Sequence, residues 1–510
     1  MAGILIKNCK VEGVGSGSVY TRDGRIISIS GNPTQHVPEG TEIIDAAGGS
    51  LVPGLIDSHC HPFEYGWLKR NVDLRGTTNV TGIRLRLFSA VEKAQPGEWV
   101  TGMGWDQETF SDRRMPNRLD IDDVSSSNPV ALSRICGHIA LLNGKAIEAL
   151  GFNARMGTEY ERDSAGELTG IVKESALTEV FDRVPRSPER AAADLQSVEV
   201  EAGRIGLTTL HCILSPEGFA DELEALASLD SSRTLSLRFR VYIPSEAVDY
   251  VESKGFRKSM NNDRLRLNGV KIYADGSLGA RTAALREPYS DDPSNNGILR
   301  QSDKELEALV DRVDSMGYQV IIHAIGDRAI EQAIDALANV TGTKNPKRHR
   351  IEHASLLPKD LRSKMAHYGI RASVQPLFIT SDTWAADRLG ERAGDLYPLK
   401  SMLDDGLIAS GSSDSPVESL SPVLGMWAAM ARDGISLDES LTQAEALGLY
   451  TSNSASNGFD EIGSSLVEGG RADMTLFDSD VEGMHPALFR KVGIAATIVD
   501  GSAIHSFGGA

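Results

Sequence analysis

Residues 51–62 read LVPGLIDSHCHP, an apolar run with strand character that stops at two histidines, His59 and His61. Alternate side chains of a strand point to the same face, so both imidazoles leave one face at the carboxyl end of this strand. Two neutral imidazoles placed in this way suit a divalent cation. The stretch therefore predicts a buried strand that carries part of a metal site.

Further strand-like runs alternate with helical stretches along the chain, which is typical of repeated βα units and a parallel sheet. The candidate strands are residues 51–57, 207–212, 237–243, 269–273, 319–323, 349–353, 371–375 and 407–412. Eight parallel strands with intervening helices predict an α/β fold, a (β/α)8 TIM barrel over residues 51–459. Such barrels carry their chemistry at the carboxyl ends of the strands.

Two additions to the barrel are predicted. Both ends of the chain, residues 1–50 and 460–510, read as short strands with turns, such as Asp23-Gly24 at a hairpin position. We expect them to form one small β-sandwich-like domain. The gap between the first two barrel strands is too long for one helix, so residues of about 70–200 must hold an insertion. An insertion that leaves the top of the first strand is expected to act as a lid.

Composition narrows the functional classes. The chain has 510 residues and a formal net charge of −19, which disfavours nucleic acid and anionic membranes as partners, although the charge also serves solubility. The four cysteines are too sparse for a disulfide framework and fit a reducing cytoplasm. We find neither a signal peptide nor an apolar run long enough to cross a bilayer. A small-molecule substrate is expected.

Chemically versatile residues stand at the ends of four other predicted strands: Lys271, His323, His353 and Asp414. With His59 and His61 they would surround one barrel mouth. Each has a purely structural alternative: the lysine could pair with Asp275, the histidines could be core residues, and the aspartate could cap the following helix. That all six occur at the appropriate strand ends by coincidence is improbable.

This order of His-x-His, Lys, His, His and Asp resembles the amidohydrolase superfamily. Local strings sharpen the resemblance to its N-substituted formamide deformylase-like branch. They are GVKIYADGSLGARTA at 269–283, HAIGDRA at 323–329, RIEHA at 350–354, SVQP at 373–376 and SDSPV at 413–417. The resemblance covers nearly the whole chain, and it implies one or two divalent metal ions, with zinc as the first expectation.

The resemblance also implies the ligand sets. One metal would be held by His59, His61, Lys271 and Asp414, and a second by Lys271, His323 and His353. Lys271 would react with carbon dioxide to give an anionic carbamate that bridges both ions. A metal-activated hydroxide would attack the carbonyl of a small amide or formamide. Asp414 would act as general base and then as general acid toward the leaving nitrogen.

Substrate contacts are harder to assign. His138 stands where the branch carries a Gly-His pair, so it is either a donor to the developing oxyanion or a loop histidine. Pocket-lining candidates are Trp105, Gln375, Arg281 and Trp384, with core packing open for Trp105 and a surface role open for Arg281. Glu174 also follows the branch pattern, without an assigned role, and His211 is read as a packed histidine.

Other reactions stay open for the same metal site. It could act on an ester, a lactone or a ring C–N bond, or serve an isomerase or a decarboxylase. A non-catalytic scaffold is a third class, but its mark would be missing ligands, and all six are present. The resemblance suggests a homo-oligomer, and fold alone does not fix the substrate because barrel loops can be exchanged.

Overall fold

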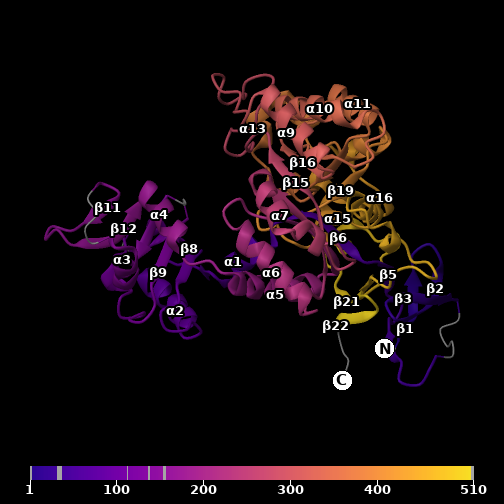
Figure 1. The fold of residues 1–510 in the computed structure, drawn as a ribbon, viewed down its shortest axis with the longest axis horizontal. Coiled ribbons are helices and arrows are strands. Elements are labelled where there is room, and N and C mark those ends of the chain that lie inside the picture. The colour runs from indigo at the N-terminus through magenta and orange to yellow at the C-terminus, as the bar shows by residue number, and fades with distance from the viewer. Residues whose placement is uncertain (1–2, 32–36, 112, 136–137, 153–156, 507–510) are drawn as a thin grey trace. The chain divides into compact units, whose positions relative to one another are not determined.

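The computed structural model describes residues 3–31, 37–111, 113–135, 138–152 and 157–506. The chain divides into two compact units, one of residues 1–64 with 195–510 and one of residues 65–194 (Figure 1). The first unit contains the predicted barrel and the strands of both chain ends. The second unit is built from the segment that the sequence assigns to an insertion.

The barrel is a parallel sheet in which, within the described residues, eight strands follow the order β6-β13-β14-β15-β16-β17-β18-β19. Their bounds are β6 Leu55–Cys60, β13 Leu207–Ile213, β14 Arg238–Pro244, β15 Leu265–Tyr273, β16 Gln319–Ala324, β17 Arg350–His353, β18 Arg371–Val374 and β19 Ala409–Gly411. The first and last strands approach each other, because Ser58 Oγ donates to Gly411 O at 2.9 Å. The amide of Asp414 also donates to His59 O at 2.8 Å. The prediction of a TIM-barrel-like α/β fold is confirmed.

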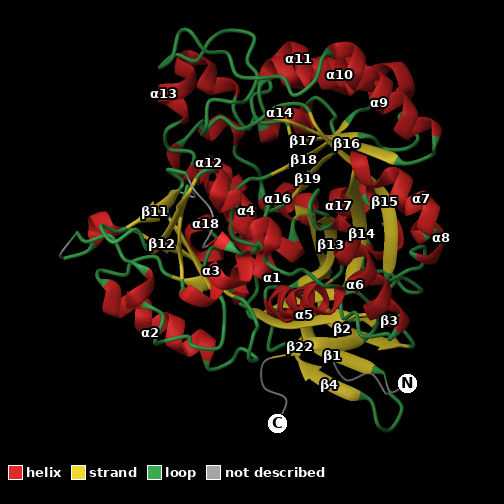
Figure 2. Cartoon of the chain, turned by 60° about the vertical axis from the view of Figure 1, so that its left-hand side comes forward, coloured by secondary structure: helices red, strands yellow, loops and turns green. Residues whose placement is uncertain are grey.

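Helices cover the outer face of these strands, and α9, α10 and α11 lie beside β16 and β17 in the upper part of Figure 2. The principal helices of this unit are α6 Phe219–Ser231, α7 Val248–Lys254, α9 Asp303–Ser315, α10 Asp327–Thr341, α11 Lys359–Tyr368, α14 Leu399–Asp404, α15 Pro422–Ala431, α16 Gln443–Tyr450 and α17 Ser452–Asn457. The apolar sides of α9 and α10 are buried, which is the expected cover for a parallel sheet.

The predicted first strand, residues 51–57, is two strands. Residues Ser50–Pro53 form β5, which belongs to the sheet of the chain ends, and β6 begins at Leu55. Gly54 joins them where the backbone passes close to Thr208, whose Oγ1 would lie only 2.2 Å from a Cβ at this position. A side chain cannot fit there, so a glycine marks the change from one sheet to the other.

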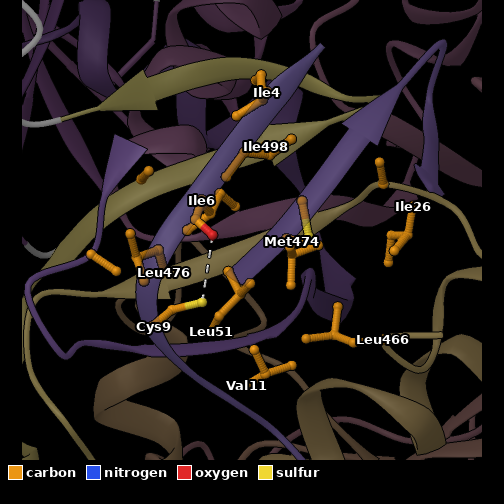
Figure 3. Packing of buried hydrophobic residues seen from close by; sticks show 14 residues of the cluster. Ile4, Ile6, Cys9, Val11, Ile26, Leu51, Leu466, Met474, Leu476 and Ile498 are labelled. Atoms are coloured by element: carbon orange, nitrogen blue, oxygen red, sulfur yellow. Dashed lines mark hydrogen bonds between the residues drawn. The ribbon is translucent and has the colours of Figure 1, made fainter. Parts of the chain in front are cut away.

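Strands from both chain ends form one mixed sheet in the order β22-β21-β20-β5-β1-β2-β3, with β4 parallel to β1. The bounds are β1 Ile4–Val11, β2 Gly15–Arg22, β3 Arg25–Ser30, β4 Glu42–Asp45, β20 Met474–Phe477, β21 Ile494–Val499 and β22 Ser502–Ser506. The predicted hairpin is present, since Asp23 and Gly24 have φ of 51° and 74°. Ile6, Leu51, Met474 and Ile498 pack together on this sheet (Figure 3). A small β-sandwich-like domain was expected from both chain ends; their strands share one continuous ladder, because β5 pairs with both β1 and β20.

The insertion unit has a sheet of its own in the order β11-β12-β10-β9-β8-β7. Its elements are β7 Val72–Asp73, β8 Val100–Trp105, β9 Val130–Arg134, β10 Ile139–Leu142, β11 Tyr160–Arg162, β12 Leu168–Lys173, α2 Val80–Val91, α3 Gly144–Leu150 and α4 Ser175–Arg183, while α1 Pro62–Arg70 and α5 Pro188–Arg204 cross its boundaries. In the described part of the chain, every helix is too short or too polar to span a bilayer.

Candidate metal centre

Three predicted ligands meet at the carboxyl ends of β6 and β19. Asp414 Oδ1 lies 3.2 Å from His59 Nε2 and 3.3 Å from His61 Nε2. One donor atom from each of these residues lies within 4.8 Å of the other two. Lys271 Nζ, from β15, is 3.2 Å from His59 Nε2. Four side chains that are up to 355 positions apart in the chain therefore converge on one point, as the sequence predicted.

The two remaining histidines join this cluster. The ring centroids of His323 and His353 are 4.5 Å apart, and His353 is 5.0 Å from His59. The structural alternative for Lys271 is not found, because the carboxylate of Asp275 instead accepts hydrogen bonds from backbone amides. Its donors are Ala284 at 3.0 Å, Ile325 at 3.1 Å and Gly326 at 2.9 Å. All six residues thus surround one volume.

Hydrogen bonds fix which imidazole nitrogens are free to bind a cation. Three of the four rings each use one nitrogen to donate to an oxygen acceptor. His59 Nδ1 pairs with the Glu352 carboxylate, His353 Nδ1 is 2.8 Å from Gln375 Oε1, and His323 Nε2 is 2.9 Å from Gly276 O. Since these acceptors require a proton on the bonded nitrogen, the lone pairs remain on His59 Nε2, His353 Nε2 and His323 Nδ1.

Two ligands have left-handed backbone conformations. His353 has φ of 70° and Asp414 has φ of 54°. Non-glycine residues pay about 1–3 kcal/mol for such conformations, which concentrate at functional sites. At His353 the left-handed backbone conformation changes the direction of the side chain. Strand alternation would send Glu352 and His353 to opposite faces, yet both contact His59.

The protonation states suit a divalent cation. Burial, aided by Lys271, lowers the pKa of His59, and burial together with His323 lowers that of His353. Burial opposes ionisation of Asp414, but His59 and His61 outweigh it and hold its pKa well below the usual range. Neutral imidazoles beside a carboxylate are a donor set that zinc-like ions bind well. The residues present therefore fit a metal.

A buried ion pair of Arg350 and Glu352 contacts the Nδ1 side of the His59 ring. Glu352, Arg350 and His59 are fully buried. Arg350 Nε donates to Glu352 Oε1 at 2.5 Å, and its Nη2 donates to Ser58 O at 2.9 Å. Tyr242 from β14 lies under the guanidinium, which is 4.7 Å from the ring centroid. Burial would raise the pKa of Glu352, but Arg350 and His59 hold it well below its ordinary value. Arg350 thus holds the Glu352 carboxylate in place, and this carboxylate orients the His59 ring.

The predicted pocket residues have different surroundings. Trp105 is fully buried in the core of the insertion, and its Nε1 donates to Leu132 O at 2.7 Å. A side chain without exposed surface cannot touch a substrate, so the structure gives Trp105 a packing role. Gln375 is also buried and supports His353 rather than presenting a free amide. Arg281 pairs with Asp291 at 2.8 Å, and Trp384 is partly exposed.

The remaining candidates lie as follows. His138 is exposed in the insertion, and its Nδ1 is 3.3 Å from Glu174 Oε2. Glu174 has φ of 47°, an unusual conformation for a glutamate. His211 is fully buried beside Arg350, and Cys60 points its thiol toward the carbonyl of His211, away from the ligands. Cys136 lies outside the described residues.

Sequence reasoning missed Glu352, Arg350 and Tyr273. The signal for the first two was present, because charged residues alternate along Arg350-Ile351-Glu352 in a strand that is otherwise a barrel core. Tyr273 stands two positions after Lys271 and therefore on the same strand face. Its ring centroid is 5.5 Å from that of His323, and burial together with Asp414 raises its pKa to about 12.

The model of the amidohydrolase family matches residues 42–505. YtcJ of Bacillus subtilis (strain 168) is 30% identical over 97% of this chain and 97% of its own. An N-substituted formamide deformylase of Arthrobacter pascens is 26% identical, with 98% of each chain covered. Among solved structures, an uncharacterized metal-dependent hydrolase of Pyrococcus furiosus aligns with a TM-score of 0.80 at 30% identity, covering 94% of this chain and 99% of that one. With its six-residue cluster at the mouth of a parallel barrel, this chain belongs to the amidohydrolase family.

Proposed function

We propose that this protein is a binuclear metal-dependent hydrolase that cleaves the amide C–N bond of a small molecule, most simply an N-substituted formamide. Family membership makes it a metal-dependent hydrolase of C–N bonds. The observation that carries the finer proposal is the position of Asp414, whose Oδ1 lies within 3.3 Å of both β6 histidines. The relative from Arthrobacter pascens, named for formamide deformylation, supports the substrate class.

In this proposal His59, His61 and Asp414 would hold one zinc-like ion, His323 and His353 would hold a second, and Lys271 would contribute a further ligand. Burial lowers the pKa of the Lys271 amine to about 8. The neutral amine is therefore favoured more than in an ordinary lysine. The neutral amine can attack carbon dioxide, forming a C–N bond and releasing a proton, and the resulting carbamate would give Lys271 an anionic oxygen ligand.

The divalent ions supply Lewis acidity, which polarises a carbonyl and lowers the pKa of bound water from ~15.7 to ~7. The side chains orient the ligand rings and transfer protons. Asp414 accepts the proton of the attacking water and passes it to the leaving nitrogen, which needs that proton to depart as a neutral amine. Glu352 and Gln375 hold two histidine rings in one tautomer.

Metal content tests the binuclear site. We expect about two equivalents of zinc-like metal per chain in the purified protein, and one or none in a Lys271→Ala variant, because alanine cannot form the bridging carbamate. The measurement is elemental analysis after exhaustive dialysis against metal-free buffer. Lys145→Ala is the matched control, since Lys145 is exposed on α3 and pairs with Glu148 at 3.1 Å.

The outcomes separate the alternatives. One equivalent that persists in the Lys271→Ala variant would establish a mononuclear site without a lysine bridge. No tightly bound metal in any preparation would favour a non-catalytic scaffold. With two equivalents in hand, a panel of N-substituted formamides, other small amides and aryl esters identifies the bond that is cleaved. Turnover of esters alone would overturn the amide assignment.

A further inference from the structure

Tyr273 ends β15 with its side chain on the same face as Lys271, and this face carries the metal cluster. Lys271 Nζ lies 5.0 Å from the centroid of the tyrosine ring. Tyr273 is paired in register with His323 on the next strand, and their ring centroids are 5.5 Å apart. The phenol therefore borders two of the six proposed ligand residues.

The ring is held from several sides. Arg300 lies over it, with the guanidinium carbon 5.3 Å from the ring centroid, and donates from Nε to the carbonyl of Asp275 at 3.1 Å. The following backbone is fixed as well, because the amide of Ala274 donates to His323 O at 2.9 Å. These contacts restrict the movement of the ring.

The Tyr273 hydroxyl does not contribute a hydrogen bond to the described part of the fold. Among the described residues, no hydrogen bond of the Tyr273 side chain is found, and the residue is only partly buried. Other large tyrosines of the barrel differ: Tyr242 donates to Gln319 at 2.9 Å, and Tyr318 donates to Glu252 at 2.6 Å. The Tyr273 hydroxyl is not among the buried side-chain atoms that lack a partner, so it is open to solvent or to a ligand, whereas a phenylalanine would fill the same space without this donor.

We infer that Tyr273 is a catalytic residue whose hydroxyl donates a hydrogen bond to the carbonyl oxygen of the bound amide. The inference rests on the proposed amide hydrolysis and adds to it a donor from the barrel. A phenol keeps its proton at neutral pH, since its ordinary pKa is ~10. A fixed donor contributes most when the carbonyl oxygen becomes an oxyanion, because it is already oriented and needs no reorganisation.

Tyr273→Phe tests this assignment, with Tyr318→Phe as the control from the outer side of the barrel. We expect the kcat for the best amide of the panel to fall ~10²-fold to ~10³-fold in Tyr273→Phe, with KM changed less than about threefold. Metal content and the thermal unfolding midpoint should match the wild type. Tyr318→Phe should retain the wild-type kcat.

Binding of methylphosphonate, a tetrahedral anion that imitates the oxyanion, gives a readout that does not depend on turnover. Calorimetry should show affinity about tenfold weaker in Tyr273→Phe than in the wild type. Wild-type kcat and unchanged methylphosphonate affinity in Tyr273→Phe would overturn the inference alone. A metal-loaded wild type that cleaves no amide of the panel would overturn the proposed function, and the inference with it.

Discussion

An Asp414→Asn variant is expected to lose about two to four orders of magnitude in kcat. The substitution removes the carboxylate that accepts a proton from water and returns it to the leaving nitrogen, a role worth ~10²-fold to ~10⁴-fold. It also removes the anionic oxygen between His59 and His61, so metal content should fall. Initial rates with the best amide of the panel, corrected for metal content, measure the two effects separately.

Asp405→Asn is the matched control for this variant. Asp405 is another carboxylate of the barrel unit, and it pairs with Arg362 at 2.9 Å, away from the cluster. The control should keep both the wild-type rate and the wild-type metal content. If Asp414→Asn retained more than a tenth of the wild-type kcat with full metal, Asp414 would not be the proton carrier.

Glu352→Ala is expected to have the largest effect on stability. Removing the carboxylate leaves Arg350 as a charge without its partner in a fully buried site, a change that typically costs about 3–5 kcal/mol. It also frees the His59 ring to rotate, which should weaken metal binding ~10-fold to ~100-fold. The measurements are the thermal unfolding midpoint of the metal-free protein and the zinc affinity by competition with a chelator.

A double variant separates these two consequences. Arg350→Met with Glu352→Leu removes both charges and fills similar volume, so stability should return toward the wild-type value. Zinc affinity should stay low, because His59 still lacks its acceptor. If the double variant bound zinc as tightly as the wild type, Glu352 would be a structural partner of Arg350 and not a support of His59. Glu352→Gln covers the case in which Glu352→Ala does not fold.

The barrel and the ligand cluster could be predicted because their signals are local. An apolar run that ends in His-x-His predicts both a buried strand and the strand face that carries the two imidazole rings. Lys271, His323 and Asp414 follow from the same reasoning at other strand ends, and the parallel topology brings strand ends together without further information. The resemblance of the surrounding strings then fixed the family.

The network beneath the cluster could not be predicted in this way. Glu352 and His353 are adjacent, and period-two alternation would separate them; only the left-handed turn at His353 brings both to His59. The split of the first strand at Gly54 depends on its approach to Thr208, which is distant in sequence. Trp105 illustrates a similar limit, since an aromatic residue near a predicted mouth looks the same in sequence whether it packs or binds.

The position of β5 sets the order in which this protein can fold during synthesis. This strand pairs with β20 on one side, and roughly 420 residues separate the two. At about 5–20 residues per second, β20 follows β5 from the ribosome by roughly 20–80 seconds. Through that interval the backbone edge of β5 has no partner on this side, and open strand edges invite pairing between chains. Pairing between nascent chains through this open edge is therefore the expected route of aggregation during synthesis.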